Sequence, residues 1–168
     1  ISEINHQGKV GVFVNESIEK IAEITEKAKL SFIQLHGDED EKFILQLRQI
    51  LGNIIKIIKV IRIGNQSFDE LQKTINQQPS TVNYLLFDTD SKAFGGTGKT
   101  FDWQILNEIE IPIPYFLSGG ISLENIHQLS TINHQPLALD INSKFEIEPG
   151  NKNLEKIKKF TQIVNKIY

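Results

Sequence analysis

Residues 84–103 read YLLFDTDSKAFGGTGKTFDW, and this stretch decides how the rest of the chain is interpreted. It opens with a short apolar run, which is typical of a buried strand, and the run ends on the carboxylate of Asp88. The carboxyl end of a parallel strand faces the crevice in which α/β proteins bind their ligands. A glycine-rich loop follows before a helical pattern starts at Phe101. Such a loop either closes over a ligand or wraps a phosphate.

The glycine-rich loop allows three interpretations. Residues 93–100 (AFGGTGKT) match a relaxed phosphate-loop pattern in which Ala93 replaces the first glycine. The context disfavours a nucleotide site, because polar residues from Asp88 to Lys92 separate the loop from its strand and only Asp140 is available, weakly, to hold magnesium. A surface loop without chemistry is the second alternative. We favour the third, a lid over a small-molecule site with Asp88 beneath it. The lid residues are Gly95, Gly96, Gly98 and Lys99.

Composition narrows the class of protein. The 168 residues carry a net charge of −3, which gives no reason to expect nucleic acid or an anionic membrane as a partner. No apolar run is long enough to span a bilayer. The chain has no cysteine, and its four histidines lack metal-ligand spacing, so we expect neither disulfides nor a metal. The chain begins with Ile1 and has no methionine, so we expect residues ahead of Ile1 in the natural protein.

Strand and helix patterns alternate along the whole chain. We expect strands at 9–14, 31–37, 54–63, 84–87, 115–117 and 137–141. Helices are predicted after each strand, beginning near Asn15, Asp38, Ser67, Phe101, Ser122 and Asn153, with Asn15 as the cap of the first and 154–167 as the span of the last. Four acidic residues, 38–41, stand at the start of the second helix, and Phe68 is expected to face inward in the third. Near Phe101 a short helix is expected, with Asp102 as its cap and Trp103 packed rather than reactive. There is no hairpin signal, and near-continuous apolar strands indicate a parallel sheet covered by helices. The pattern does not separate an open doubly wound sheet from a closed barrel, and no linker divides the chain, so we predict one domain over 1–168.

Polar residues follow the predicted strands. In a barrel these strand ends meet around one mouth, where such enzymes keep their sites. Gly119 and Gly120 lead into a helix and, with the residues after the sixth strand, match the recurrent phosphate position of barrels. His36 is either a ligand contact or a histidine bonded to its neighbours, and Lys59 is expected to extend to water rather than bind an anion. The strand-end residues are Asn15, His36, Asp88, Ser118, Asp140 and Asn142.

Five motifs together resemble one known family, the phosphoribosylanthranilate isomerases. They are FIQLHG (32–37), DT (88–89), GGTGKTFDW (95–103), LSGG (117–120) and DINS (140–143). The resemblance runs over nearly the whole chain, and GGTGKTFDW is its most specific part. It implies a (β/α)₈ barrel that acts in the cytoplasm, in tryptophan biosynthesis, on a phosphorylated small molecule. The implied reaction is the Amadori rearrangement of N-(5-phosphoribosyl)anthranilate to 1-(2-carboxyphenylamino)-1-deoxyribulose 5-phosphate, without a cofactor.

The resemblance also implies roles for individual residues. Asp88 becomes the general acid that protonates the ribose ring oxygen, and burial beneath the closed lid helps it to hold a proton. His36 and Asp140 line the sugar and anthranilate pocket. The phosphate ligands are Gly119, Gly120, Asn142 and Ser143.

Two departures from the family pattern matter. Lys144 stands where the family has a glycine. The family's general base, a cysteine after its first strand, and an arginine after its second strand are both absent, because this chain starts at about the third strand. We therefore expect six β/α units, strands 3–8 of the barrel, with an N-terminal segment ahead of them. A nucleotide-binding module and a non-catalytic doubly wound domain remain the alternatives, and the oligomeric state is not predicted.

Overall fold

The computed structural model describes residue 6, residues 8–90 and residues 100–167. The predicted lid residues Gly95, Gly96, Gly98 and Lys99 lie outside the described residues. Six described strands form one sheet whose order follows the chain, β1 to β6. Strand β1 pairs with β2, β2 with β3, and β5 with β6, all in parallel. The strands are β1 (Val10–Phe13), β2 (Phe32–Leu35), β3 (Lys56–Ile63), β4 (Tyr84–Thr89), β5 (Tyr115–Leu117) and β6 (Ala138–Leu139).

The strand order distinguishes the two architectures that the sequence left open. A doubly wound sheet reverses its strand order at a switch point, because its two halves are wound in opposite directions from the centre. The six described strands show no such reversal. A sequential parallel order is the order of a (β/α) barrel, in which each strand lies beside its predecessor.

The four α-helices of the described residues each begin close to a predicted position, because their apolar residues recur at helical spacing. Ser17 caps α1 by accepting from the backbone N–H of Lys20, so the predicted cap at Asn15 is wrong. Phe68, predicted to face inward, is 42% exposed at the start of α3, whereas Leu71 and Ile75 are buried. The helices are α1 (Ile18–Ala28), α2 (Glu41–Leu51), α3 (Phe68–Asn76) and α4 (Leu154–Ile167).

Three other described segments form short 3₁₀ helices. They are η1 (Trp103–Asn107), η2 (Ile126–Thr131) and η3 (Ser143–Phe145). Helix η1 lies where a short helix was predicted, and η2 lies where an α-helix from Ser122 was predicted. Before η2, the side chain of Asn125 accepts from the N–H of Ser122 at 2.8 Å and donates to the carbonyl of Gly120 at 3.1 Å. Such local side-chain bonds compete with the first turn of an α-helix, so the helix predicted from Ser122 does not form.

A two-stranded antiparallel hairpin follows η3, although no hairpin was predicted. It consists of β7 (Glu146–Glu148) and β8 (Asn151–Lys152). The turn contains Pro149 and Gly150, and Gly150 has φ of 83°. The hairpin follows directly on Phe145, whose ring meets that of Phe160 in α4 at 4.9 Å and 74°. The prediction missed it because its strands are too short to show alternation.

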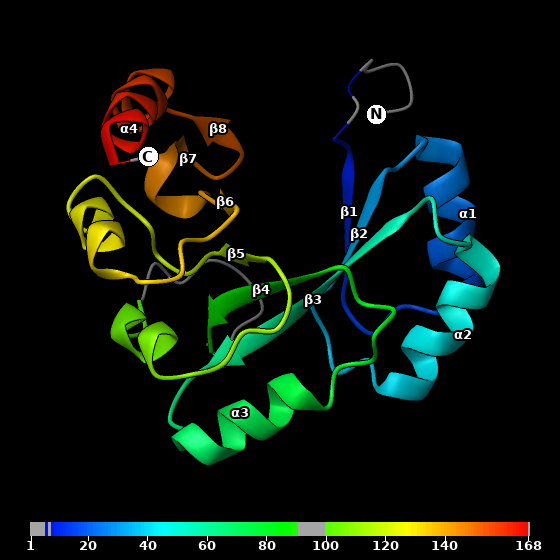
Figure 1. The fold of residues 1–168 in the computed structure, drawn as a ribbon. Coiled ribbons are helices and arrows are strands. Elements are labelled where there is room, and N and C mark those ends of the chain that lie inside the picture. Colours follow the sequence, from blue (N-terminus) through cyan, green and yellow to red (C-terminus); the bar gives the residue numbers. More distant parts are fainter. Residues whose placement is uncertain (1–5, 7, 91–99, 168) are drawn as a thin grey trace. The chain divides into compact units, whose positions relative to one another are not determined.

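The chain clusters into two compact units, Ile1–Ile61 with Lys73–Leu86 and Arg62–Gln72 with Phe87–Tyr168. In the first unit, α1 and α2 lie side by side (Figure 1). Its core includes side chains below 2% exposure: Ile21, Ile33, Leu35, Ile44, Leu47, Ile57, Ile58 and Leu85. The second unit contains an edge-to-face pair, Phe87 and Tyr115, with ring centres 5.3 Å apart. Trp103, predicted to pack rather than react, is 1% exposed in η1.

A buried arginine, which the sequence did not single out, closes the first unit at the amino ends of its strands. Arg48 on α2 is 9% exposed. Its guanidinium donates to the carbonyls of Gly52, Ile55 and Thr81 at 2.7, 2.6 and 2.7 Å, and to Asn83 Oδ1 at 2.8 Å. Burial lowers the pKa of Arg48. Arginine suits this position because its planar fork carries five donors.

Candidate active site

The proposed acid, Asp88, lies at the carboxyl end of β4 and is half-buried. One carboxylate oxygen accepts the backbone N–H of Thr89 at 2.8 Å. Gly119, directly after β5, approaches both residues closely. A Cβ at Gly119 would lie 2.8 Å from the Thr89 nitrogen and 3.1 Å from Asp88 Oδ1. The absence of a side chain at Gly119 therefore allows the loop after β5 to lie against Asp88.

The two glycines after β5 have an unusual backbone. Gly119 and Gly120 have φ of 88° and 67°, a region that residues with a side chain rarely adopt. The loop is joined to β4 by a hydrogen bond from the Ser118 N–H to the Phe87 carbonyl, at 2.8 Å. Consecutive backbone N–H groups in turn conformations of this kind form anion-binding concavities. The phosphate site predicted at this loop stays a prediction.

Asp140 follows β6 and is exposed. Its N–H donates to the Leu117 carbonyl at 2.8 Å, which continues the pairing of β6 with β5. Its carboxylate accepts from the Ser118 hydroxyl at 3.4 Å. The structure thus brings together Asp140 and Ser118, which were both predicted as strand-end residues.

Asn142 and Ser143, the other predicted phosphate residues, lie where η3 begins. The backbone of Asn142 has φ of −137° and ψ of −99°, outside the regular regions. Its side-chain oxygen accepts from Lys152 Nζ, which also pairs with Glu146 at 2.7 Å. The Lys152 bond lowers the pKa of Glu146. The unpredicted hairpin therefore supplies the lysine that holds the Asn142 side chain.

Positive charge accumulates near the same segment. The Lys156 ammonium donates to the Lys144 carbonyl at 3.3 Å. Hydrogen bonding from the Ser122 hydroxyl lowers the pKa of Glu124, and the charges of Lys156 and Lys144 lower it further. Lysines near a loop favour an anionic ligand there.

His36 belongs to the first unit and is half-buried just after β2. Its N–H donates to the Phe13 carbonyl at 2.8 Å, and its Nδ1 lies 3.2 Å from the side-chain nitrogen of Gln34. His36 is therefore bonded to its neighbours, as one of its two predicted interpretations states. Its contact with a ligand stays a prediction.

The prediction for Lys59 is wrong. Its side chain does not extend to water but is 7% exposed and pairs with Glu39, which is 2% exposed, at 2.8 Å. Glu39 was interpreted as one of four acidic groups at a helix start. The sequence contains one clue to the pair, because a lysine stands in an otherwise apolar stretch of β3.

The described part of the chain has neither a metal-binding cluster nor a membrane-spanning helix. Residues 6, 8–90 and 100–167 contain no group of three or more His, Cys, Asp or Glu side chains that could hold a metal ion. Among the helices of these same ranges, none has the length and apolar character needed to cross a bilayer.

Comparisons with known proteins agree with the motifs. Residues 1–163 match the family model described as N-(5'phosphoribosyl)anthranilate (PRA) isomerase. A relative from Parabacteroides distasonis named N-(5'-phosphoribosyl)anthranilate isomerase is 39% identical over 155 residues, which are 92% of this chain and 67% of the relative. The crystal structure of phosphoribosyl anthranilate isomerase from Thermus thermophilus is similar in fold, with a TM-score of 0.76 at 24% identity, covering 96% of this chain and 74% of that one.

A further solved structure is informative about ligands. It is a phosphoribosyl anthranilate isomerase in complex with reduced 1-(o-carboxyphenylamino)-1-deoxyribulose 5-phosphate. It has a TM-score of 0.67 and 29% identity, covering 91% of this chain and 69% of that one. These matches do not favour the nucleotide-binding alternative.

Proposed function

The chain belongs to the N-(5'-phosphoribosyl)anthranilate isomerase family, and from this membership we propose that Asp88 is the general acid of the Amadori rearrangement in tryptophan biosynthesis. The observation that carries the assignment is the close approach of the Gly119 loop to a half-buried strand-end carboxylate. A catalytic acid must lie within hydrogen-bond reach of the atom that it protonates. A carboxylate beside the phosphate loop is well placed to reach a sugar whose phosphate that loop holds.

The proposed chemistry begins with opening of the ribose ring. Asp88 donates its proton to the ring oxygen while the nitrogen lone pair forms a C=N bond at C1, and the C1–O bond breaks. A base then removes the proton from C2, which gives the enolamine and, after tautomerisation, the ketone. The cysteine that the family resemblance implies for this base is not among the 168 residues. The proposal for this chain therefore concerns the acid and the binding residues.

We assign the phosphate to Gly119, Gly120, Asn142 and Ser143. The positive φ of both glycines and the lysines near Asn142 support this assignment. A related isomerase that binds a phosphorylated product analogue supports the ligand class. Lys144, in place of the family's glycine, contributes positive charge nearby. His36 and Asp140 are proposed to contact the sugar and anthranilate parts.

We also propose that the six strands are six consecutive units, strands 3–8, of a single (β/α)₈ barrel domain. The sequential parallel order supports the barrel. The boundary between the two compact units runs through β3 and β4, which argues against a linker between separate domains.

Calorimetry with two ligands tests the function. The purified protein is titrated with reduced 1-(o-carboxyphenylamino)-1-deoxyribulose 5-phosphate and, separately, with ATP and magnesium. We expect the first to bind and the second not to bind. Binding of ATP alone would reverse the assignment in favour of a nucleotide site. Crystals grown with sulfate should then show the anion between the Gly119–Gly120 loop and Asn142–Ser143.

A further inference from the structure

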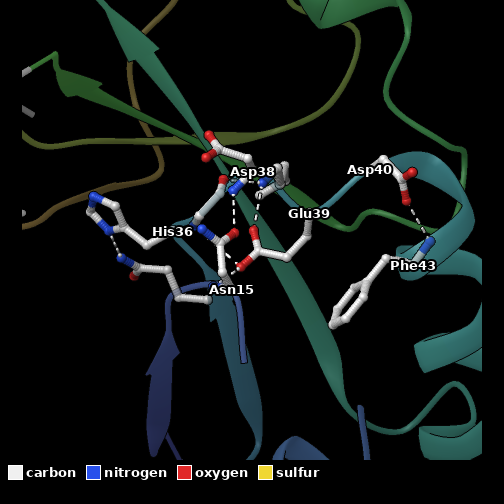
Figure 2. A network of polar contacts seen from close by, with 9 residues as sticks. Asn15, His36, Asp38, Glu39, Asp40 and Phe43 are labelled. Atoms are coloured by element: carbon white, nitrogen blue, oxygen red, sulfur yellow. Dashed lines mark hydrogen bonds and ion pairs between the residues drawn. The ribbon is translucent and has the colours of Figure 1, made fainter. Parts of the chain in front are cut away.

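A polar network around a buried ion pair joins the ends of three neighbouring strands in the first unit. Its members are Asn15 after β1, Gly37 and Glu39 after β2, and Lys59 on β3. The Glu39 carboxylate accepts from the N–H groups of Asn15 and Gly37 at 2.9 and 3.2 Å, and from Lys59 at 2.8 Å. Lys59 also donates to the Gly37 carbonyl at 2.8 Å. Figure 2 shows the Glu39 carboxylate beside Asn15. One ion pair therefore contacts the backbone of both loops.

The two loops also fit tightly against each other. Asn15 has φ of 51°, an unfavourable region for a residue with a side chain. Its side-chain oxygen accepts from the Asp38 N–H at 2.7 Å. A Cβ at Gly37 would lie 2.6 Å from the Asn15 nitrogen, so only glycine fits there. Strained backbone of this kind persists only where several contacts hold it in place.

His36 lies directly before this network. Its own N–H is bonded to β1 through the Phe13 carbonyl, and the next residue, Gly37, is held through both its N–H and its carbonyl. The backbone is thus fixed on both sides of His36. The Gln34 amide next to Nδ1 orients the ring.

We propose that Glu39 and Lys59 are positioning residues for substrate binding, which act by fixing the backbone that carries His36. This inference rests on the proposed function of His36 as a substrate contact. Stability alone does not explain the pair, because a buried ion pair replaced by apolar residues of similar size is often as stable or more stable. Directed contacts to both polar groups of Gly37 are what apolar side chains do not provide.

The first test replaces the pair by apolar residues, Glu39→Leu with Lys59→Met. We expect the double variant to melt cooperatively but to bind the reduced product analogue about tenfold more weakly, with KM raised and kcat changed less than about threefold. Amide hydrogen exchange at Asn15 and Gly37 should become faster. The matched control is the exposed pair on α1, Glu23→Leu with Lys27→Met, whose ions lie 2.5 Å apart and which should leave binding unchanged.

A double-mutant cycle separates positioning from a general structural effect. His36→Ala is made alone and in the Glu39→Leu/Lys59→Met background. If the pair acts through His36, the combined variant should bind the analogue no more weakly than His36→Ala alone, because the same interaction is lost once. Additive losses of affinity, or wild-type affinity in the Leu/Met variant, would overturn the proposal.

A second variant covers the case in which the Leu/Met protein does not fold. Asn15→Gly tolerates the positive φ but removes the oxygen that accepts from Asp38, and it leaves the ion pair intact. We expect weaker analogue binding, because the two loops then keep only their contacts to the ion pair. Lys59→Met alone, which removes the donor to the Gly37 carbonyl, should weaken analogue binding as well. Wild-type affinity in Lys59→Met would overturn the proposal. Failure of the proposed function is distinguishable, because the wild-type protein itself would then not bind the analogue.

Discussion

Substitution of Gly119 by alanine should lower kcat/KM strongly while lowering thermal stability only moderately. The new Cβ would lie 2.4 Å from Thr89 Oγ1 and 2.8 Å from the Thr89 nitrogen. The hydroxyl can rotate away, but the nitrogen is backbone. To reach an ordinary contact of 3.4 Å, the loop and the end of β4 must separate by about 0.6 Å, the difference between 3.4 and 2.8 Å. That displacement occurs beside Asp88.

The size of the effect follows from this displacement. A shift of about 1 Å in a catalytic group costs roughly 10²-fold in rate, so we expect kcat/KM to fall by about 10- to 100-fold. The positive φ of 88° adds strain of about 1–3 kcal/mol for alanine. In a protein of this size that strain lowers Tm by about 2–12 °C.

Gly52→Ala is the matched control. Gly52 also has a positive φ, of 65°, but a Cβ there meets nothing within 4 Å. This variant should lose stability through backbone strain. It should keep kcat/KM within about twofold, because Gly52 follows α2 and does not lie at the carboxyl end of a strand. Steady-state kinetics and thermal unfolding of both variants, made in the full-length protein, measure the contrast. Equal losses of kcat/KM in the two variants, or an unaffected Gly119→Ala, would refute the close approach at Asp88.

Asp88→Asn should lower kcat by about 10²–10⁴-fold, the usual cost of losing a general acid, while the Kd of the reduced analogue changes little; a wild-type kcat would remove Asp88 from the mechanism. Arg48→Met should lower the free energy of unfolding in urea by about 2–4 kcal/mol, because buried acceptors lose their donor, and Arg48→Lys should recover only part; a loss below about 1 kcal/mol would contradict this. Hydrogen bonds from Lys27 and Lys20 lower the pKa of Glu23 to about 2 from its usual 4.5. A carboxyl group whose pKa is lower in the folded than in the unfolded protein stabilises the fold at pH above its unfolded pKa, and this stabilisation is lost as pH falls through its folded pKa. The difference in unfolding free energy between wild type and Glu23→Gln should therefore shrink between about pH 5 and pH 2. High salt should reduce it as well. A difference that does not depend on pH would show that these exposed pairs contribute nothing.

The sequence alone determined the features that depend on neighbouring residues. Apolar spacing predicted α4 at its observed bounds and placed the six strands, because helical and strand periodicities are local properties. The motifs between residues 32 and 143 identified the family, which the comparisons confirm. The capping role of Asp102 and the burial of Trp103 were also predicted correctly.

Only the tertiary structure decided which polar residues meet. Glu39 looked like its three acidic neighbours, and Lys59 looked like a lysine that extends to water. The parallel register of β2 and β3 sets Leu35 beside Lys59, and this pairing lets the lysine reach a carboxylate 20 positions away in the chain. Arg48 likewise binds acceptors up to 35 positions away. A pattern of neighbouring residues does not contain such contacts, because they depend on how strands pair and on which side chains lose water when the sheet forms.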